Sequence, residues 1–242
     1  MKIIEKFKAK VYDHDNAPAV TIAFLGDSVT QGCFDVYTDE NNKIQVYTDS
    51  EAVFHNKIRK IFSKLYPTVP LNIINAGISG NCSWDAYKRM EKDVISHGAD
   101  LCVIAFGAND AFVEGGTCIE KFKETIGKII DRLKNEGIEV ILMTQSMMCT
   151  KVSCHIADPL LIETAEGVSN MQNSGRFEAF MEAAKDVARE KNVPVCDVYA
   201  KWKKMYDGGV DITRLLANHI NHPDEDMHWL FAYSLVETMY NE

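Results

Sequence analysis

The sequence lacks the marks of a membrane or secreted protein. No apolar run approaches the roughly 18 residues that a membrane-spanning helix requires. Charged residues interrupt residues 1–8 every few positions, so a signal-peptide core is not expected there. The seven cysteines are scattered and form no CxxC pair, a usage that fits a reducing compartment. We therefore expect a cytoplasmic location.

Positive charge is also scarce. Lys and Arg number 26 against 35 Asp and Glu, which gives a formal net charge of −9. An acidic chain repels phosphate backbones and anionic lipid surfaces, so neither nucleic acid nor a membrane is an expected partner. The sequence shows no linker, low-complexity tract or solenoid period, and 46% of its residues are hydrophobic. It therefore predicts a single domain over residues 1–242.

Strand and helix patterns alternate along the chain. Short apolar runs, typical of parallel strands covered on both faces, lie at residues 19–25, 71–76, 101–106, 139–144 and 193–198. Apolar residues at helical spacing lie at 48–65, 83–96, 119–135, 177–191 and 230–240. The first of these helices is expected to open on Thr48 and Glu51, a capping-box signature. The alternation predicts a doubly wound α/β domain.

Two segments interrupt this alternation. Residues 31–49 repeat the tetrapeptide Val-Tyr-Thr-Asp around a polar centre, which predicts a hairpin flap. Residues 146–173 follow the fourth predicted strand and make a long connection by ordinary standards. Both leave from the carboxyl ends of strands, where ligands of such sheets bind. We therefore expect both segments to shape a pocket.

Small, polar residues follow the first three predicted strands, at 26–32, 76–81 and 107–110. Ser28 offers a hydroxyl nucleophile and its own backbone N–H. Gly80 lets a backbone N–H approach a substrate without a Cβ in the way, with Gly77 as the alternative, and the Asn109 side chain adds an amide donor. A serine beside aimed donors is the arrangement of an acyl-transfer site.

A nucleophilic serine also needs a general base, and three histidines gather before the last predicted helix: His219, His222 and His228. Together with Asp224 and Asp226, they can alternatively be interpreted as a metal cluster, but their spacing matches no common zinc motif. We expect no metal and no cofactor.

The order and spacing of these blocks resemble the SGNH hydrolase superfamily, also called GDSL esterases and lipases. Val29 stands where leucine gives that family its name. The family's blocks correspond to residues 26–28, 75–80, 107–110 and 222–223, which span almost the whole chain.

The resemblance implies a role for each of these residues. Ser28 is the nucleophile, His222 is the base, and Ser28, Gly80 and Asn109 form the oxyanion hole. The implied fold is a flavodoxin-like, three-layer α/β/α sandwich around a five-stranded parallel sheet. The family usually has aspartate three residues before the histidine, a position that His219 occupies here.

This departure leaves open what orients the imidazole of His222. A backbone carbonyl near residue 219 could accept the Nδ1 proton, Asp224 or Asp226 could reach back, or the site could be slow. Loss of an orienting carboxylate can lower turnover by ~10⁴.

The expected function is serine carboxylic-ester hydrolysis through an acyl-enzyme, on small acyl esters such as acetylated carbohydrates. The partner is then a small-molecule ester. Lysophospholipase and thioesterase activities are alternatives within this class. A non-catalytic binding module that retains the pocket is the alternative from another class.

Overall fold

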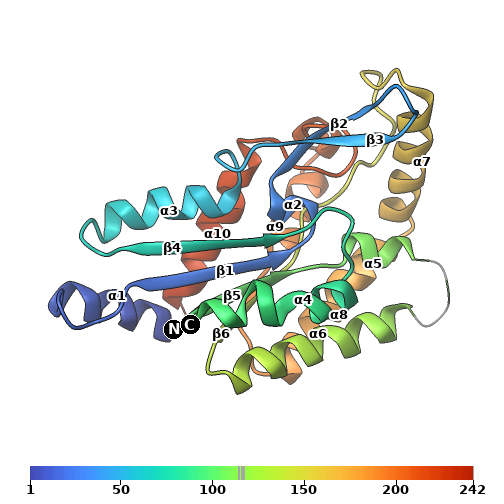
Figure 1. Ribbon diagram of the computed structural model, residues 1–242. Helices are drawn as coiled ribbons and strands as arrows, with labels where there is room; N and C mark the ends of the chain where they lie inside the picture. Colours follow the sequence, from blue (N-terminus) through green and yellow to red (C-terminus); the bar gives the residue numbers. More distant parts are fainter. Residues whose placement is uncertain (114, 116–117, 242) are drawn as a thin grey trace.

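A five-stranded parallel sheet forms the centre of the computed structural model, which describes residues 1–113, 115 and 118–241 (Figure 1). Its order is β4-β1-β5-β6-β7, the order of a flavodoxin-like sheet. The strands are β1 (Val20–Gly26), β4 (Leu71–Gly77), β5 (Leu101–Ala105), β6 (Glu139–Met143) and β7 (Val195–Cys196). The predicted sheet is confirmed. The last strand is shorter than predicted at both ends, since Pro194 has no N–H to pair and Asp197 caps the helix that follows.

Helices cover both faces of the sheet, which confirms the three-layer arrangement (Figure 1). One face carries α1 (Lys2–Tyr12), α3 (Phe54–Leu65) and α10 (Met227–Asn241). The other carries α4 (Ser83–Asp93), α6 (Cys118–Asn135) and α8 (Arg176–Glu190). None of the described helices is long and apolar enough to cross a membrane.

The first helix, α1, has no counterpart among the predicted elements. Its buried residues Ile3, Ile4 and Phe7 follow helical spacing, and the ring of Phe7 stacks on Phe62 of α3 with centroids 4.5 Å apart. Charged residues lie between these apolar positions, so the segment has no continuous hydrophobic run to mark it in the sequence. An amphipathic surface helix nevertheless shows this pattern, with an apolar face and a charged face.

The predicted helix over residues 48–65 begins later than expected, at Phe54. The carboxylate of Asp49 accepts the N–H groups of Glu51 and Ala52, which closes a turn in place of the capping box. The Phe54 N–H is accepted by Nδ1 of His228, 3.1 Å away, in α10. A tertiary contact thus fixes where this helix starts.

Both insertions lie at the carboxyl ends of the strands (Figure 1). Residues 31–49 contain the predicted hairpin, formed by β2 (Cys33–Thr38) and β3 (Ile44–Thr48). The long connection is not all loop, because it ends in α7 (Pro159–Asn173). Asp158 caps that helix and Pro159 occupies its first turn, two start signals in the sequence.

The remaining helices are short or peripheral. They are α2 (Ser28–Gln31), α5 (Ala108–Phe112), α9 (Val198–Asp207) and the 3₁₀ turns Ile95–His97 and Ile212–Leu215. The helices α2 and α5 begin directly after the adjacent strands β1 and β5. The chain passes from β1 to β4 on one side and then to β5 on the other, so α2 and α5 meet at the topological switch point, where open α/β sheets bind ligands.

Candidate active site

Ser28 is the first residue of the single-turn helix α2 and is 7% exposed. Asp27 precedes it and accepts the Val29 N–H, 3.1 Å away, as the N-cap. The loop after β4 packs closely on this turn, because a Cβ at Gly77 would lie 2.2 Å from the backbone nitrogen of Gln31. Only glycine at position 77 permits this approach of the second block to the first.

The imidazole of His222 faces Ser28, with Nε2 3.0 Å from Oγ. His222 is 4% exposed, and burial lowers its pKa to about 4, against smaller raising effects of the Phe34 carbonyl and the Asp35 carboxylate. The ring is therefore neutral at physiological pH, the state that a general base requires. The structure brings together the serine and the histidine that the sequence paired.

The other two C-terminal histidines have separate partners. His228 is fully buried against the aromatic rings of Phe54 and Phe231, which also contact each other, and it accepts the Phe54 N–H. The ring of His219 stacks on His155 with centroids 5.2 Å apart, and its Nδ1 contacts the Thr213 carbonyl. In the described part of the chain, no group of three or more His, Cys, Asp or Glu side chains is placed to hold a metal ion.

Asn218, which the sequence did not indicate, lies against the far side of the His222 ring. Its Nδ2 is 3.2 Å from Nδ1, the atom that an orienting carboxylate would contact. The structure places Asn218 at this position, and orientation of His222 by Asp224 or Asp226 stays a prediction. Asp224 accepts the Met227 N–H at the start of α10, and the Asp226 carbonyl accepts the Trp229 N–H.

The orientation of the Asn218 amide follows from its backbone contacts. Its Oδ1 accepts three N–H groups of the following turn, those of Ile220, Asn221 and His222, at 2.9 to 3.1 Å. His219 adopts a left-handed φ of +55° within this turn, a conformation that folds residues 220–222 back over Asn218. The nitrogen of the amide therefore points at the His222 ring.

The expected oxyanion donors come from the ends of β4 and β5. Gly80 has a φ of +76°, and a Cβ added there would meet no heavy atom within 4 Å, so this side of the turn is open. The Ser79 N–H donates to Oε1 of Gln31 at 2.6 Å, which ties the turn to α2. The amide of Asn109 donates to the Asn81 carbonyl at 2.9 Å. Gly80 and Asn109 are thus linked to each other and to the Ser28 turn.

A buried polar network links the residues next to Ser28 and Asn109. Gln145 donates from Nε2 to the Asp27 carboxylate at 2.6 Å, and its Oε1 accepts the Ala108 N–H at 2.8 Å. Burial raises the pKa of Asp27 to about 7, and the nearby Asp110 carboxylate adds to this. Gln145 directly follows the fourth strand, so inspection of that strand end would have found it.

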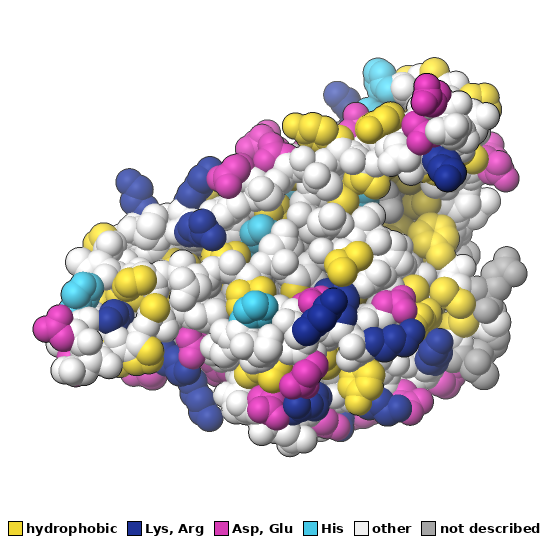
Figure 2. Space-filling view, viewed as in Figure 1, with side chains coloured by type: hydrophobic (Ala, Val, Ile, Leu, Met, Phe, Trp, Pro, Cys, Tyr) yellow, Lys and Arg dark blue, Asp and Glu magenta, His cyan; other side chains and the backbone are white. Residues whose placement is uncertain are grey.

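A cleft of about 530 Å³ opens beside Asn218, between the flap and the segment that leads to α7. Its polar lining includes Asp35, Tyr37, Thr38, His155, Asp158 and His219. In Figure 2 the flap and α7 project from the body of the molecule, and the surface is hollowed beneath them. Both insertions therefore line a cleft next to Asn218 and His219, in the turn that leads to His222.

Comparison with known proteins finds curated relatives that each match about half of this chain. The chain is 30% identical over 151 residues to an uncharacterized lipoprotein, YqeF, of Bacillus subtilis (strain 168), a match over 57% of this chain and 59% of that protein. It is 24% identical over 131 residues to an acetylxylan esterase of Geobacillus stearothermophilus, over 51% of this chain and 58% of the relative. The chain thus spans about three fifths of the length of the curated relatives it matches.

Solved structures match over more of the chain. A lipase/acylhydrolase from Enterococcus faecalis has a TM-score of 0.64 at 25% identity, and the match covers 90% of this chain and 94% of that one. The acetylxylan esterase Axe2 from Geobacillus stearothermophilus shares the fold, with a TM-score of 0.67 at 20% identity over 92% and 95% of the two chains. The family model described as the GDSL-like lipase/acylhydrolase family matches residues 24–230. This chain belongs to that family.

Proposed function

We propose that this chain hydrolyses carboxylic esters through an acyl-enzyme on Ser28. The observation that carries the proposal is the 3.0 Å contact between Ser28 Oγ and Nε2 of a buried, neutral His222. Oγ attacks the ester carbonyl carbon while its proton passes to Nε2, a step that requires the neutral ring to carry its own proton on Nδ1. The tetrahedral intermediate collapses, the alcohol takes the proton from Nε2, and water then releases the acid by the same steps. The N–H groups of Ser28 and Gly80 and the Asn109 amide stabilise the oxyanion.

The proposed substrates are small acyl esters of polar alcohols, with acetylated carbohydrates first. Two observations support this choice. The cleft beside Asn218 carries carboxylate, hydroxyl, imidazole and phenol groups that can bind a hydroxyl-rich alcohol, next to the apolar side chains of Val36, Ile156 and Leu161. Two relatives are an acetylxylan esterase and an arylesterase, each matched over 58% of its length. Location in the cytoplasm stays a prediction, and one relative is named a lipoprotein.

The experiment that tests this proposal combines covalent labelling with an acyl-chain series. A fluorophosphonate probe should label the purified chain once, at Ser28, as located by peptide mass spectrometry. The p-nitrophenyl acetate rate should exceed the octanoate rate, and acetylated xylo-oligosaccharides should release acetate. Absence of both labelling and hydrolysis would favour a binding module. A preference for octanoate would overturn the substrate class and leave the mechanism standing.

The acidic limb of the pH–rate profile should lie well below the ordinary histidine pKa of 6.5. The base is the neutral imidazole, so activity is lost as the pH falls through the folded-state pKa, which burial lowers to about 4. We expect kcat/KM for p-nitrophenyl acetate to change little from pH 7 to pH 5 and then to fall. Rates measured from pH 4 to 8, with tryptophan fluorescence to verify folding, check this. A midpoint near 6.5 would show that His222 is solvated or is not the base.

A further inference from the structure

Arg89 of α4 is a largely buried cation whose guanidinium contacts the ends of β1 and β4 and the side chain of Asn81. Its side chain is 10% exposed. Nη2 donates to the Gly26 carbonyl at 3.0 Å, and Nη1 donates to the Ala76 carbonyl at 2.8 Å. Nε donates to Oδ1 of Asn81, also at 2.8 Å. The carboxylate of Asp93, one turn along α4, accepts from Nη1 at 3.1 Å and balances the charge.

The acceptors of Arg89 lie next to the residues proposed to bind the oxyanion. Gly26 ends β1, two residues before Ser28, and Ala76 lies at the end of β4. Asn81 directly follows Gly80, and its carbonyl accepts the amide of Asn109 at 2.9 Å. One side chain is thus bonded to the segments that carry Ser28 and Gly80, and through Asn81 it is linked to Asn109.

Arginine is suited to this place. Its guanidinium is planar, always charged, and presents donors in a fixed fork, so acceptors on different segments are held at fixed mutual distances. A lysine ammonium is a flexible point charge and cannot reproduce that spacing. Two backbone carbonyl oxygens at the strand ends accept hydrogen bonds from the guanidinium. These contacts offset the cost of burying its positive charge.

We propose that Arg89 is a positioning residue for the oxyanion hole. It holds the Gly80–Asn81 turn against the end of β1, so that the Gly80 N–H and the Asn109 amide meet the negative charge that develops on the substrate oxygen at Ser28. This inference rests on the proposed ester hydrolysis. Arg89 itself does not contact the substrate, and its effect passes through Asn81 and the two strand ends.

The test compares Arg89→Lys and Arg89→Met with the wild type on p-nitrophenyl acetate. Oxyanion donors act on the transition state rather than on the bound ester, so kcat should fall by roughly 10- to 100-fold while KM stays nearly constant. The affinity for an alkyl boronic acid, which forms a tetrahedral adduct on the serine, should fall by a similar factor. Circular dichroism should show the wild-type spectrum for both variants.

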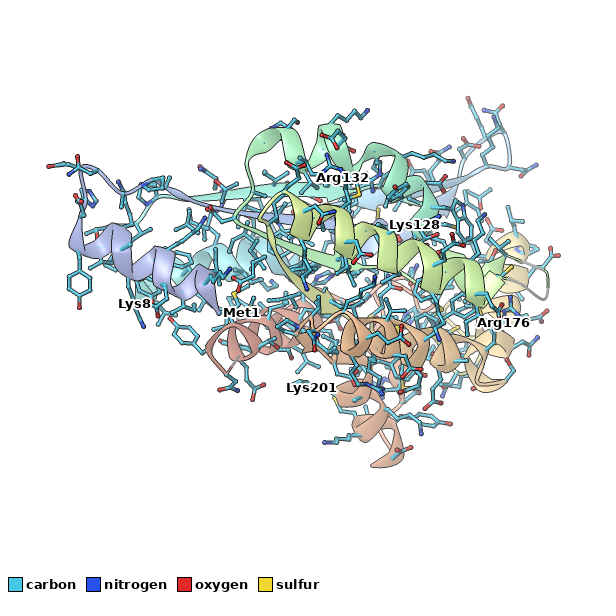
Figure 3. All side chains as sticks on the ribbon, turned by 90° about the horizontal axis from the view of Figure 1, so that it is seen from below. Met1, Lys8, Lys128, Arg132, Arg176 and Lys201 are labelled. Atoms are coloured by element: carbon cyan, nitrogen blue, oxygen red, sulfur yellow. The ribbon has the colours of Figure 1, made fainter. Side chains whose placement is uncertain are left out.

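Arg132→Met is the matched control. Arg132 lies on the neighbouring helix α6, at its outer surface (Figure 3), and pairs with Glu91 and Glu136 rather than with strand ends. It should keep the wild-type kcat and boronate affinity. Wild-type kcat and boronate affinity in both Arg89 variants would overturn the inference, as would a change confined to KM.

Asn81→Ala provides a second test should the Arg89 variants not fold. It removes the acceptor of Arg89 Nε and leaves the backbone carbonyl that accepts from Asn109. A lower kcat and a weaker boronate affinity at constant KM are again expected, and wild-type values would contradict the role of Arg89. A wild type that hydrolyses no ester would overturn the proposed function and this inference together, whereas an active wild type with unaffected variants would overturn the inference alone.

Discussion

Replacement of His222 by alanine should lower kcat for p-nitrophenyl acetate by about 10⁴- to 10⁶-fold, and Ser28→Ala should have an effect of similar size. Without the imidazole, no group at 3.0 Å takes the proton of the Ser28 hydroxyl, which is a weak nucleophile at its ordinary pKa. Because the two side chains act as one unit, the double variant should lose little beyond either single variant. Initial rates at saturating ester, normalised to the concentration of folded protein, measure all three.

His219→Asn is the matched control for the loss of a C-terminal histidine. Asparagine tolerates the left-handed φ of +55° at this position, and the ring of His219 contacts His155 and Thr213 rather than Ser28. This variant should keep a kcat close to that of the wild type on p-nitrophenyl acetate, which lacks the hydroxyl-rich alcohol proposed for the cleft that His219 lines. If His222→Ala instead retains its turnover, or if His219→Asn loses as much, the base is not His222.

The placement of Ser28, Gly80 and Asn109 was predictable because it depends on a regular feature. Parallel strands carry their carboxyl ends to one edge of the sheet, and apolar runs mark those ends in the sequence. The same reasoning located both insertions. It also applies to Gln145, which lies two residues beyond the end of β6 and was overlooked because its block has no small-residue turn.

Asn218 and Arg89 could not be found in this way. Asn218 contacts His222 because of one left-handed residue, His219, whose backbone conformation has no sequence signature when the residue is not glycine. Two of the acceptors of Arg89 are backbone carbonyls, which every residue carries, so the sequence gives no sign of them. The start of α3 shows a related limit. The Thr48–Glu51 signature predicted a start near residue 48, whereas Asp49 closes a turn there and the helix begins at Phe54, whose N–H is accepted by His228.

Asn218 also determines which nitrogen of His222 carries the proton. An amide nitrogen only donates hydrogen bonds, and the three N–H groups on Oδ1 fix the amide with Nδ2 toward the ring. With this amide as the donor, Nδ1 is the acceptor, and the neutral ring then carries its proton on Nε2, facing Ser28 and available to the Phe34 carbonyl. This tautomer cannot take the serine proton. Each turnover therefore requires a rearrangement at Asn218 that a carboxylate would make unnecessary.

Asn218→Asp should accordingly raise kcat by on the order of 10²-fold, part of the ~10⁴ by which an asparagine in place of an orienting aspartate lowers turnover. One carboxylate oxygen keeps the three backbone N–H groups, and the other accepts the Nδ1 proton. Asn221, whose Oδ1 now accepts from Asn218 at 2.9 Å, can turn its own amide to donate instead. The new negative charge also favours the imidazolium, so the pKa of His222 rises and the acidic limb of the rate profile moves to higher pH.

Asn221→Asp is the control that separates charge from contact. It adds the same charge in the same turn and keeps an acceptor for the Asn218 amide, but it does not face Nδ1. It should leave kcat close to that of the wild type. Nitrogen-15 NMR of the histidine ring gives a readout independent of rate, with the proton on Nε2 in the wild type and on Nδ1 in Asn218→Asp. If the wild-type ring already carries its proton on Nδ1, or if Asn218→Asp is no faster than Asn221→Asp, then Asn218 does not limit the base.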